Sequence, residues 1–371
     1  DAETGAVVPP IHLSTTYAFR GFEDKRPYDY SRSGNPTRDL LAKALADLEG
    51  GVGANVLATG MAAITLVGCL LPVGARIVAP HDCYGGSYRL FDAWRRRGEF
   101  HCDFVDFADE AAVRAALKQP TALLWIETPS NPLLRITDIA QFAELGHAAG
   151  ALVAVDNTFL SPLWQKPLML GADIVVHSTT KYLNGHSDVV GGAVIAATPA
   201  QHEQLSWWAN CTGATGAAFD SYLTLRGLRT LHVRLEQHGR NAARLADWLQ
   251  AQPGVNRVFY PGLSSHPGHA IAARQQQGFG AVVTLEIAGG QEAVRALVSR
   301  MQFFSLAESL GGVESLISHP ATMTHAAMEP EARRRAGLTD GLLRLSVGIE
   351  DFDDLRDDFA AGLERARAVR R

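Results

Sequence analysis

The chain has 371 residues, of which 47% are hydrophobic and 20% charged, and its formal net charge is −5 at pH 7. This composition is that of a globular protein with one large domain and a smaller one, and the slight excess of acid argues against nucleic acid as a main partner. The longest apolar run, residues 61–73, is interrupted by Gly68 and Pro72, so no membrane span is predicted.

The four cysteines are far apart in the sequence and form no CxxC pair. This spacing predicts neither a disulfide framework nor a cysteine metal site, and it favours a reduced, cytoplasmic protein. The first five residues also lack the basic and apolar regions of a signal peptide.

Residues 1–40 are rich in Pro, Gly, Tyr and Arg and keep no hydrophobic period, so we expect an extended N-terminal arm. A helical pattern begins at about Thr37, and short apolar runs then alternate with longer amphipathic stretches. The predicted strands are 75–80, 104–105, 122–126, 152–155, 174–176 and 192–196. Such alternation favours an α/β domain, assigned to 41–240, with a mostly parallel sheet covered on both faces.

The remaining chain has a different pattern. A long helical stretch covers about 219–250, and strands are predicted at 254–260, 281–287 and 342–347. We assign residues 241–371 to a smaller α+β domain.

Polar side chains follow two of the predicted strands. Asp156 ends the apolar run 151–155, at the strand end where ligands bind in open α/β sheets. Taken alone, such an Asp is about as often a helix cap or half of a structural ion pair. The next strand ends in Ser178, Thr179, Thr180 and Lys181, and hydroxyls beside a lysine suit a phosphate next to a reactive amine.

A single lysine is usually a solvated surface charge, but the pairing of Lys181 with Asp156 favours another interpretation. Pyridoxal phosphate (PLP) requires a lysine for a Schiff base with its aldehyde and a carboxylate on its ring nitrogen. Gly60 opens a predicted helix whose N-terminus can hold a phosphate, although glycine is common there. Tyr84 follows a strand and can stack on a flat cofactor or pack as an ordinary turn residue.

Competing motifs are absent from the sequence. It contains no G-x-G-x-x-G, G-x-x-x-x-G-K-[ST], H-E-x-x-H or G-x-S-x-G pattern. The histidines are scattered, and Pro267 and Gly268 separate His266 from His269, so no metal site is predicted.

Several segments together resemble the Cys/Met-metabolism family of PLP enzymes, the trans-sulfuration enzymes. The similar segments are Tyr30–Thr37, Thr59–Met61, Tyr84–Tyr88, Glu127–Pro132, Val155–Thr158 and Ser178–His186. The resemblance extends over nearly the whole chain. It implies the aspartate-aminotransferase-like fold (fold type I), with a mostly parallel seven-stranded sheet in the large domain and a smaller α+β C-terminal domain.

The resemblance also implies roles at the cofactor. Lys181 would form the Schiff base, Asp156 would keep the ring nitrogen protonated, and Tyr84 would stack on the ring and take a proton from the incoming amine. The phosphate would be held by Gly60, Met61, Ser178 and Thr180 of one subunit and by Tyr30 and Arg32 of a neighbour. A dimer is then the minimal active unit, and a homotetramer is expected.

On the substrate side, the resemblance implies that Arg344 binds the α-carboxylate, assisted by Asn131 and Ser309. The candidates for the distal groups are Asp29 and Glu308 for the ammonium of the cysteine portion and Arg89 for the acyl carboxylate.

Residues 81–92, 207–210, 219–231 and 307–325 are most similar to family members that replace the acyl group of an O-acylhomoserine by L-cysteine, giving L-cystathionine. Ser33 stands where close relatives that use the succinyl ester often have a second Arg. This difference weakens the case for O-succinylhomoserine over O-acetylhomoserine as the acyl donor. The alternatives are a γ-eliminating lyase, an O-acylhomoserine sulfhydrylase, and a PLP-binding protein without turnover. The sequence lacks the glycine-rich motif with which nicotinamide dehydrogenases bind their cofactor, which argues against that class of enzyme.

Overall fold

The computed structural model describes the chain except residues 2, 325, 327–336 and 370–371. Its larger sheet has seven strands in the order β1-β7-β6-β5-β4-β2-β3. These are β1 (Gly53–Leu57), β2 (Arg76–Pro80), β3 (His101–Val105), β4 (Leu123–Glu127), β5 (Leu152–Asp156), β6 (Ile174–Ser178) and β7 (Gly192–Ala196). Strands β2 to β6 are parallel, whereas β7 runs antiparallel to both β1 and β6. The expected mostly parallel, seven-stranded sheet is therefore confirmed.

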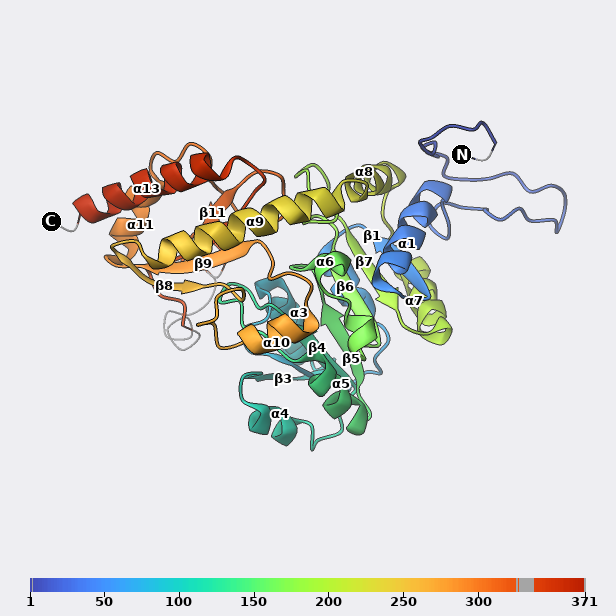
Figure 1. The fold of residues 1–371 in the computed structure, drawn as a ribbon. Helices are drawn as coiled ribbons and strands as arrows, with labels where there is room; N and C mark the ends of the chain where they lie inside the picture. Colours follow the sequence, from blue (N-terminus) through green and yellow to red (C-terminus); the bar gives the residue numbers. More distant parts are fainter. Residues whose placement is uncertain (2, 325, 327–336, 370–371) are drawn as a thin grey trace.

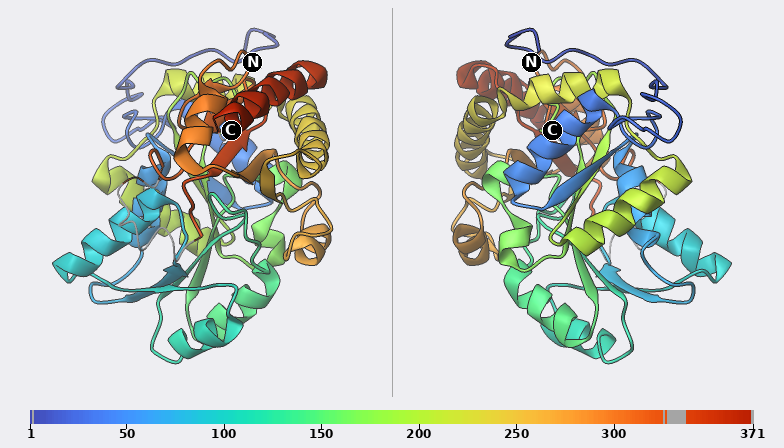
Figure 2. Two further views of the ribbon diagram at one scale, coloured as in Figure 1. Left: turned by 90° about the vertical axis from the view of Figure 1, so that its left-hand side faces the viewer. Right: turned by 90° about the vertical axis from the view of Figure 1, so that its right-hand side faces the viewer.

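Helices cover both faces of this sheet (Figure 2). On one face lie α2 (Gly60–Gly68), α3 (Gly85–Arg97) and α7 (Pro199–Thr212), and on the other α1 (Pro36–Glu49), α4 (Glu110–Ala116), α5 (Ile139–Ala148) and α6 (Ser161–Trp164). Trp125 and Val176 point into the first layer, and Leu124 and Val153 into the second. Because these strands are buried on both faces, their sequences are continuous apolar runs without alternating polar residues.

The second sheet has five strands in the order β10-β11-β12-β9-β8, of which only β10 and β11 pair in parallel. Its strands are β8 (Val255–Phe259), β9 (Val282–Ile287), β10 (Ser305–Leu306), β11 (Leu316–Ser318) and β12 (Leu342–Ser346). The helices described in this part include α10 (His269–Gln275), α11 (Gly290–Val298) and α13 (Phe352–Ala368). A 3-10 turn, η1 (Pro167–Leu170), lies in the larger part. Figure 1 shows α9 (Leu231–Gln250) lying along this second sheet.

The single helix predicted over 219–250 is two helices, α8 (Ala218–Leu228) and α9. The Gly227 carbonyl near the break accepts hydrogen bonds from Thr230 Oγ1 at 3.2 Å and from Arg234 Nη2 at 2.8 Å. Together with the Thr230 N–H at 3.2 Å, these side chains satisfy an oxygen that the next turn of a continuous helix would have paired.

The N-terminal arm extends away from the rest of the molecule (Figure 1). In the described residues before α1, its regular structure is limited to two isolated β-bridges, Thr16 with Tyr30 and Gly21 with Asp24. Its apolar side chains are largely uncovered, with Phe22 96% and Val7 87% exposed. The helix predicted from Thr37 begins at Pro36, because Asn35 accepts hydrogen bonds from the first free N–H groups of α1.

Candidate active site

A pocket of about 270 Å³ lies at the carboxyl ends of β4, β5 and β6, where α/β sheets bind ligands. Arg344 in β12 and residues that follow β10 in the second sheet also line it, so both sheets contribute to the site. Eleven of the predicted site residues line it: Gly60, Met61, Tyr84, Asn131, Asp156, Ser178, Thr180, Lys181, Glu308, Ser309 and Arg344.

Lys181 stands three residues beyond the end of β6, and its Nζ donates a hydrogen bond of 2.7 Å to Ser309 Oγ. Burial, helped by the nearby positive charge of Arg344 and opposed by the Glu308 carboxylate, lowers the pKa of this amine from 10.5 to about 8. An appreciable fraction of the amine is therefore neutral, and so nucleophilic, near neutral pH.

Asp156 and Glu127 are register partners at the ends of β5 and β4. Burial raises the pKa of Asp156, while hydrogen bonds from Thr158 and the charge of His177 oppose the rise. Burial and the Asp156 carboxylate raise the pKa of Glu127 well above its ordinary value. A cationic ring nitrogen beside Asp156 would favour its ionised form, since an opposite charge stabilises a buried carboxylate.

The N-terminus of α2 lies directly against the end of β6. A Cβ on Gly60 would stand 2.9 Å from Ser178 Cβ, so only glycine allows this approach. Thr59 Oγ1 accepts from Ala62 N–H at 2.9 Å, which caps the helix and leaves the Gly60 and Met61 N–H groups at its positive end. With the hydroxyls of Ser178 and Thr180 lining the same pocket, this donor set fits a phosphate.

Tyr84 is the residue immediately before α3, and its side chain is 43% exposed. A Cβ on Gly86 would stand 2.4 Å from Tyr84 Cε1 and 2.6 Å from Met61 Sδ. The ring therefore lies over the bare backbone of Gly86 and beside the start of α2, at the mouth of the pocket.

Arg344 in β12 is a buried guanidinium without an acidic partner among the ion pairs of the described chain. Nη1 donates to Asn131 Oδ1 at 2.9 Å and Nη2 to the Ser309 carbonyl at 2.8 Å, whereas Nε has no hydrogen-bond partner. Burial lowers its pKa to about 10. Arg344 lines the pocket, and a buried cation without an acidic partner there suits a carboxylate ligand.

Four predicted site residues do not line the pocket of their own chain: Asp29, Tyr30, Arg32 and Arg89. On the arm, Arg32 Nε donates to Asn210 Oδ1 at 3.1 Å, and Tyr30 is half exposed. Asp29 pairs with Lys25 at 2.7 Å, and this contact lowers the pKa of its carboxyl to about 2.

Arg89 lies in the first turns of α3, close to Tyr84. Its Nη1 is 3.6 Å from the position that a Cβ on Gly85 would take. It is thus beside the pocket mouth without being among the residues that line it.

Some pocket residues had no predicted role. Glu127 accepts the Tyr84 N–H, and Thr158 Oγ1 accepts the Ser178 N–H at 2.9 Å. Glu127 follows the predicted strand 122–126 just as Asp156 follows 151–155, so the same strand-end pattern signals it. In the described residues, no cluster of three His, Cys, Asp or Glu side chains is arranged to hold a metal ion.

The model of the family described as "Cys/Met metabolism PLP-dependent enzyme" matches residues 1–364. The chain belongs to this family. PLP is therefore its cofactor, and the lysine, carboxylate and phosphate-binding donors described above fit that cofactor.

Two relatives of this PLP-dependent family indicate its range of reactions. The chain is 57% identical to cystathionine gamma-synthase of Escherichia coli (99% of this chain, 95% of that one) and 49% identical to cystathionine beta-lyase of Coxiella burnetii (98% and 94%). Among solved structures, it is similar to cystathionine gamma synthase from Xanthomonas oryzae pv. oryzae in complex with cystathionine. That similarity has a TM-score of 0.98 and 59% identity, covering 99% of this chain and 95% of that one.

The fold class expected from the resemblance is confirmed by these similarities. In the described part of the chain, no helix has the length and apolar character needed to cross a membrane.

Proposed function

We propose that this protein is a cystathionine γ-synthase, which replaces the acyl group of O-succinylhomoserine or O-acetylhomoserine by L-cysteine to give L-cystathionine. The observation that carries this proposal is its similarity, over almost its full length, to the synthase of Escherichia coli. The pocket adds a physical reason, since a reactive amine and a carboxylate-binding guanidinium face one space in it.

On the cofactor side, Lys181 would hold PLP through its aldehyde group and Asp156 would pair with the ring nitrogen. The phosphate would be held by the start of α2 at Gly60 and Met61 and by the hydroxyls of Ser178 and Thr180. Bound PLP accepts the electron density that develops on the substrate carbons.

On the substrate side, Arg344 binds the α-carboxylate, with Asn131 and Ser309 fixing the guanidinium. Once the amino group of the substrate has displaced it from the cofactor, the Lys181 amine would take the proton from Cα of the substrate and move protons between Cα and Cβ. The Tyr84 ring would contact the cofactor, and its phenolic oxygen, when ionised, would accept a proton from the incoming amino group.

The distal groups of the substrates define the remaining contacts. Glu308 lines the pocket and binds the ammonium of the cysteine portion together with Asp29, while Arg89 binds the acyl carboxylate. Ser33 Oγ donates to Asp29 Oδ1 at 2.8 Å. A serine here contributes no second positive charge for a succinyl carboxylate, so both esters have to be tested.

The arm completes the phosphate site of a neighbouring subunit through Tyr30 and Arg32. This assignment is supported by the exposure of the apolar arm residues and by the position of both side chains outside the pocket of their own chain. We therefore propose a homotetramer with a dimer as its smallest active unit, and light scattering of the purified protein tests this. The four free cysteines support a reducing, cytoplasmic location.

The rival function is cleavage of cystathionine, which the 49% identity to a cystathionine beta-lyase favours. The decisive experiment is product analysis of the holoenzyme given each homoserine ester with cysteine, and separately given L-cystathionine. Cystathionine formed faster than it is broken down establishes the synthase and names its donor. Faster cleavage, with release of 2-oxobutanoate or pyruvate, assigns a lyase and contradicts the proposal.

A further inference from the structure

Tyr84 has few side-chain contacts that would hold its ring in place. Tyr84 is 43% exposed, and it makes no side-chain capping bond at the start of α3. Its position over Gly86 is therefore set chiefly by the main chain of the loop 81–84, which connects β2 with α3. Groups that hold this loop also determine where the ring lies.

A buried carboxylate holds the last residue of the loop. The Tyr84 N–H donates to both oxygens of Glu127, at 3.0 Å to Oε1 and 2.8 Å to Oε2. This N–H lies at a helix start, where backbone donors have no partner within the helix and a carboxylate is a favourable acceptor. Glu127 thus ties the start of α3 to the end of β4.

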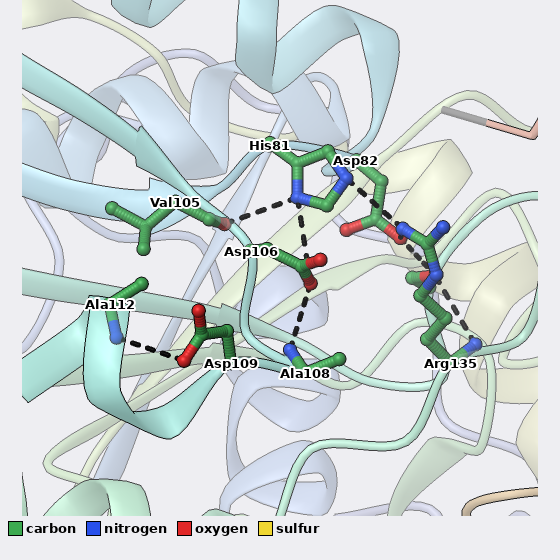
Figure 3. A network of polar contacts seen from close by, with 9 residues as sticks. His81, Asp82, Val105, Asp106, Ala108, Asp109, Ala112 and Arg135 are labelled. Atoms are coloured by element: carbon green, nitrogen blue, oxygen red, sulfur yellow. Dashed lines mark hydrogen bonds and ion pairs between the residues drawn. The ribbon is translucent and has the colours of Figure 1, made fainter. Parts of the chain in front are cut away.

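A second carboxylate, Asp82, ties the same loop to the segment that follows β4. Its Oδ2 accepts from Ser130 Oγ at 2.8 Å and from Arg135 Nη1 at 3.0 Å. Figure 3 shows Asp82 and Arg135 facing each other. The Asp82 side chain is only 12% exposed, so this pair is better shielded than an ordinary surface ion pair. Ser130 directly precedes Asn131, which contacts Arg344.

The first residue of the loop is held from the opposite side. The His81 N–H donates to the Val105 carbonyl at 2.8 Å, and His81 Nδ1 lies 3.8 Å from Asp106 Oδ1. His81 Nε2 is 3.1 Å from Arg135 Nη1, so Arg135 lies between the two neighbouring residues His81 and Asp82 (Figure 3). The loop is therefore anchored at its first, second and fourth residues, all through buried or partly buried contacts.

We propose that Asp82 is a positioning residue for Tyr84, because it ties the loop that carries the ring to the Ser130–Asn131 segment. Asn131 in this segment supports Arg344, which binds the substrate carboxylate. The inference rests on the proposed function, in which the ring contacts the cofactor and Asn131 supports Arg344. Asp82 does not line the pocket, so it acts on the reaction through the placement of Tyr84 and not by contact with the substrate. Glu127 assists from inside the pocket by holding the same main chain.

The test compares the holoenzyme variants Asp82→Ala and Asp109→Ala. Asp109 is a matched control in the same region, because it caps α4 through Ala112 N–H at 3.1 Å and has no contact with the loop 81–84 (Figure 3). Asp82→Ala is expected to lower kcat/KM on the order of 10- to 100-fold, the effect of misplacing a group at the reacting centre. It also weakens the visible circular dichroism of the bound cofactor at equal cofactor content, whereas Asp109→Ala changes neither.

The deciding measurement is the same substitution in a Tyr84→Ala background. If Asp82 acts through the ring, the double variant loses little more activity than Tyr84→Ala alone. An equal fold-loss in both backgrounds, or a circular dichroism band unchanged by Asp82→Ala, overturns the proposal. If Asp82→Ala does not fold, Ser130→Ala removes one of the two bonds to Oδ2 and must show the same non-additivity at a smaller size. The dichroism readout needs no turnover, so it tests this inference even if the proposed reaction is wrong.

Discussion

The Lys181 amine donates its hydrogen bond to Ser309, a residue 128 positions away, at 2.7 Å. Ser309 has a φ of +91°, which is rare for a residue with a side chain. In this conformation its hydroxyl meets Lys181 while its carbonyl accepts from Arg344 at 2.8 Å. One strained residue thus joins the reactive amine of the large sheet to the guanidinium of the second sheet, as strained backbone often does at functional sites.

Lys181→Ala is expected to abolish turnover and the visible absorption of the bound cofactor, because no other group replaces the buried amine. Lys166→Ala, which removes an exposed lysine of the same domain, is the control. Turnover retained by Lys181→Ala would remove this lysine from its assigned role. Activity and the absorption spectrum are measured on the same preparation.

The rate at which the apoenzyme recombines with PLP should rise with pH and level off above about 8. Only the neutral amine attacks the aldehyde, and the Lys181 amine loses its proton through a pKa of about 8 rather than 10.5. Since the charge of Arg344 helps to lower this pKa, Arg344→Met should move the profile to higher pH. Stopped-flow absorption measures both profiles, and a rate that still increases up to pH 10 in the unmodified protein would contradict the assignment.

Arg344→Lys should raise KM for the amino-acid substrate far more than it lowers kcat. Lysine keeps the charge but cannot hold Asn131, Ser309 and a carboxylate with one planar group. The expected increase is about 10- to 100-fold, the effect of losing one charge-assisted hydrogen bond. Steady-state kinetics at saturating cofactor give the two constants separately, and an unchanged KM would place the carboxylate elsewhere.

Arg32→Ala should weaken cofactor retention, although Arg32 lies outside the pocket of its own chain. The control is Arg20→Ala, since Arg20 is on the same arm and pairs only with neighbouring arm residues, at 3.1 Å from Asp24 Oδ1. Equilibrium dialysis of both holoenzyme variants against buffer gives the PLP dissociation constants. Equal constants for the two variants would speak against a phosphate site shared between subunits.

Glu49→Leu should be strongly destabilising, because Glu49 is a fully buried acid at the end of α1. Its Oε1 lies 2.5 Å from His177 Nε2 and accepts from Asn157 Nδ2 at 2.9 Å. Removing one member of such a buried pair costs about 3–5 kcal/mol. Asp47→Asn, which removes a surface pair with Lys43 on the same helix, should cost no more than about 0.5 kcal/mol. Thermal unfolding of the two apoenzymes measures the difference.

Much of the fold was accessible from the sequence, because the buried parallel strands are continuous apolar runs and their polar ends are visible. Asp156, Lys181 and the start of α2 at Gly60 were identified from these local patterns, and all three line the pocket. Glu127 carries the same strand-end signal but was given no role, because its partner is a backbone N–H 43 residues away. The helix break at 229–230 is not evident from the sequence for a similar reason. There, Arg234 in the following helix donates a hydrogen bond to the Gly227 carbonyl in the interrupted turn.

The sequence by itself determined the family, the α/β class and the groups that PLP requires, since these depend on residue types at short spacings. Only the tertiary structure decided how distant segments meet: that Ser309 lies between Lys181 and Arg344, that Arg344 has no acidic partner among the residues the structure describes, and that Asp82 and Glu127 hold the Tyr84 loop. These relationships join residues from 35 to 128 positions apart. They depend on the packing of the two sheets and the loops between them, which no local periodicity encodes.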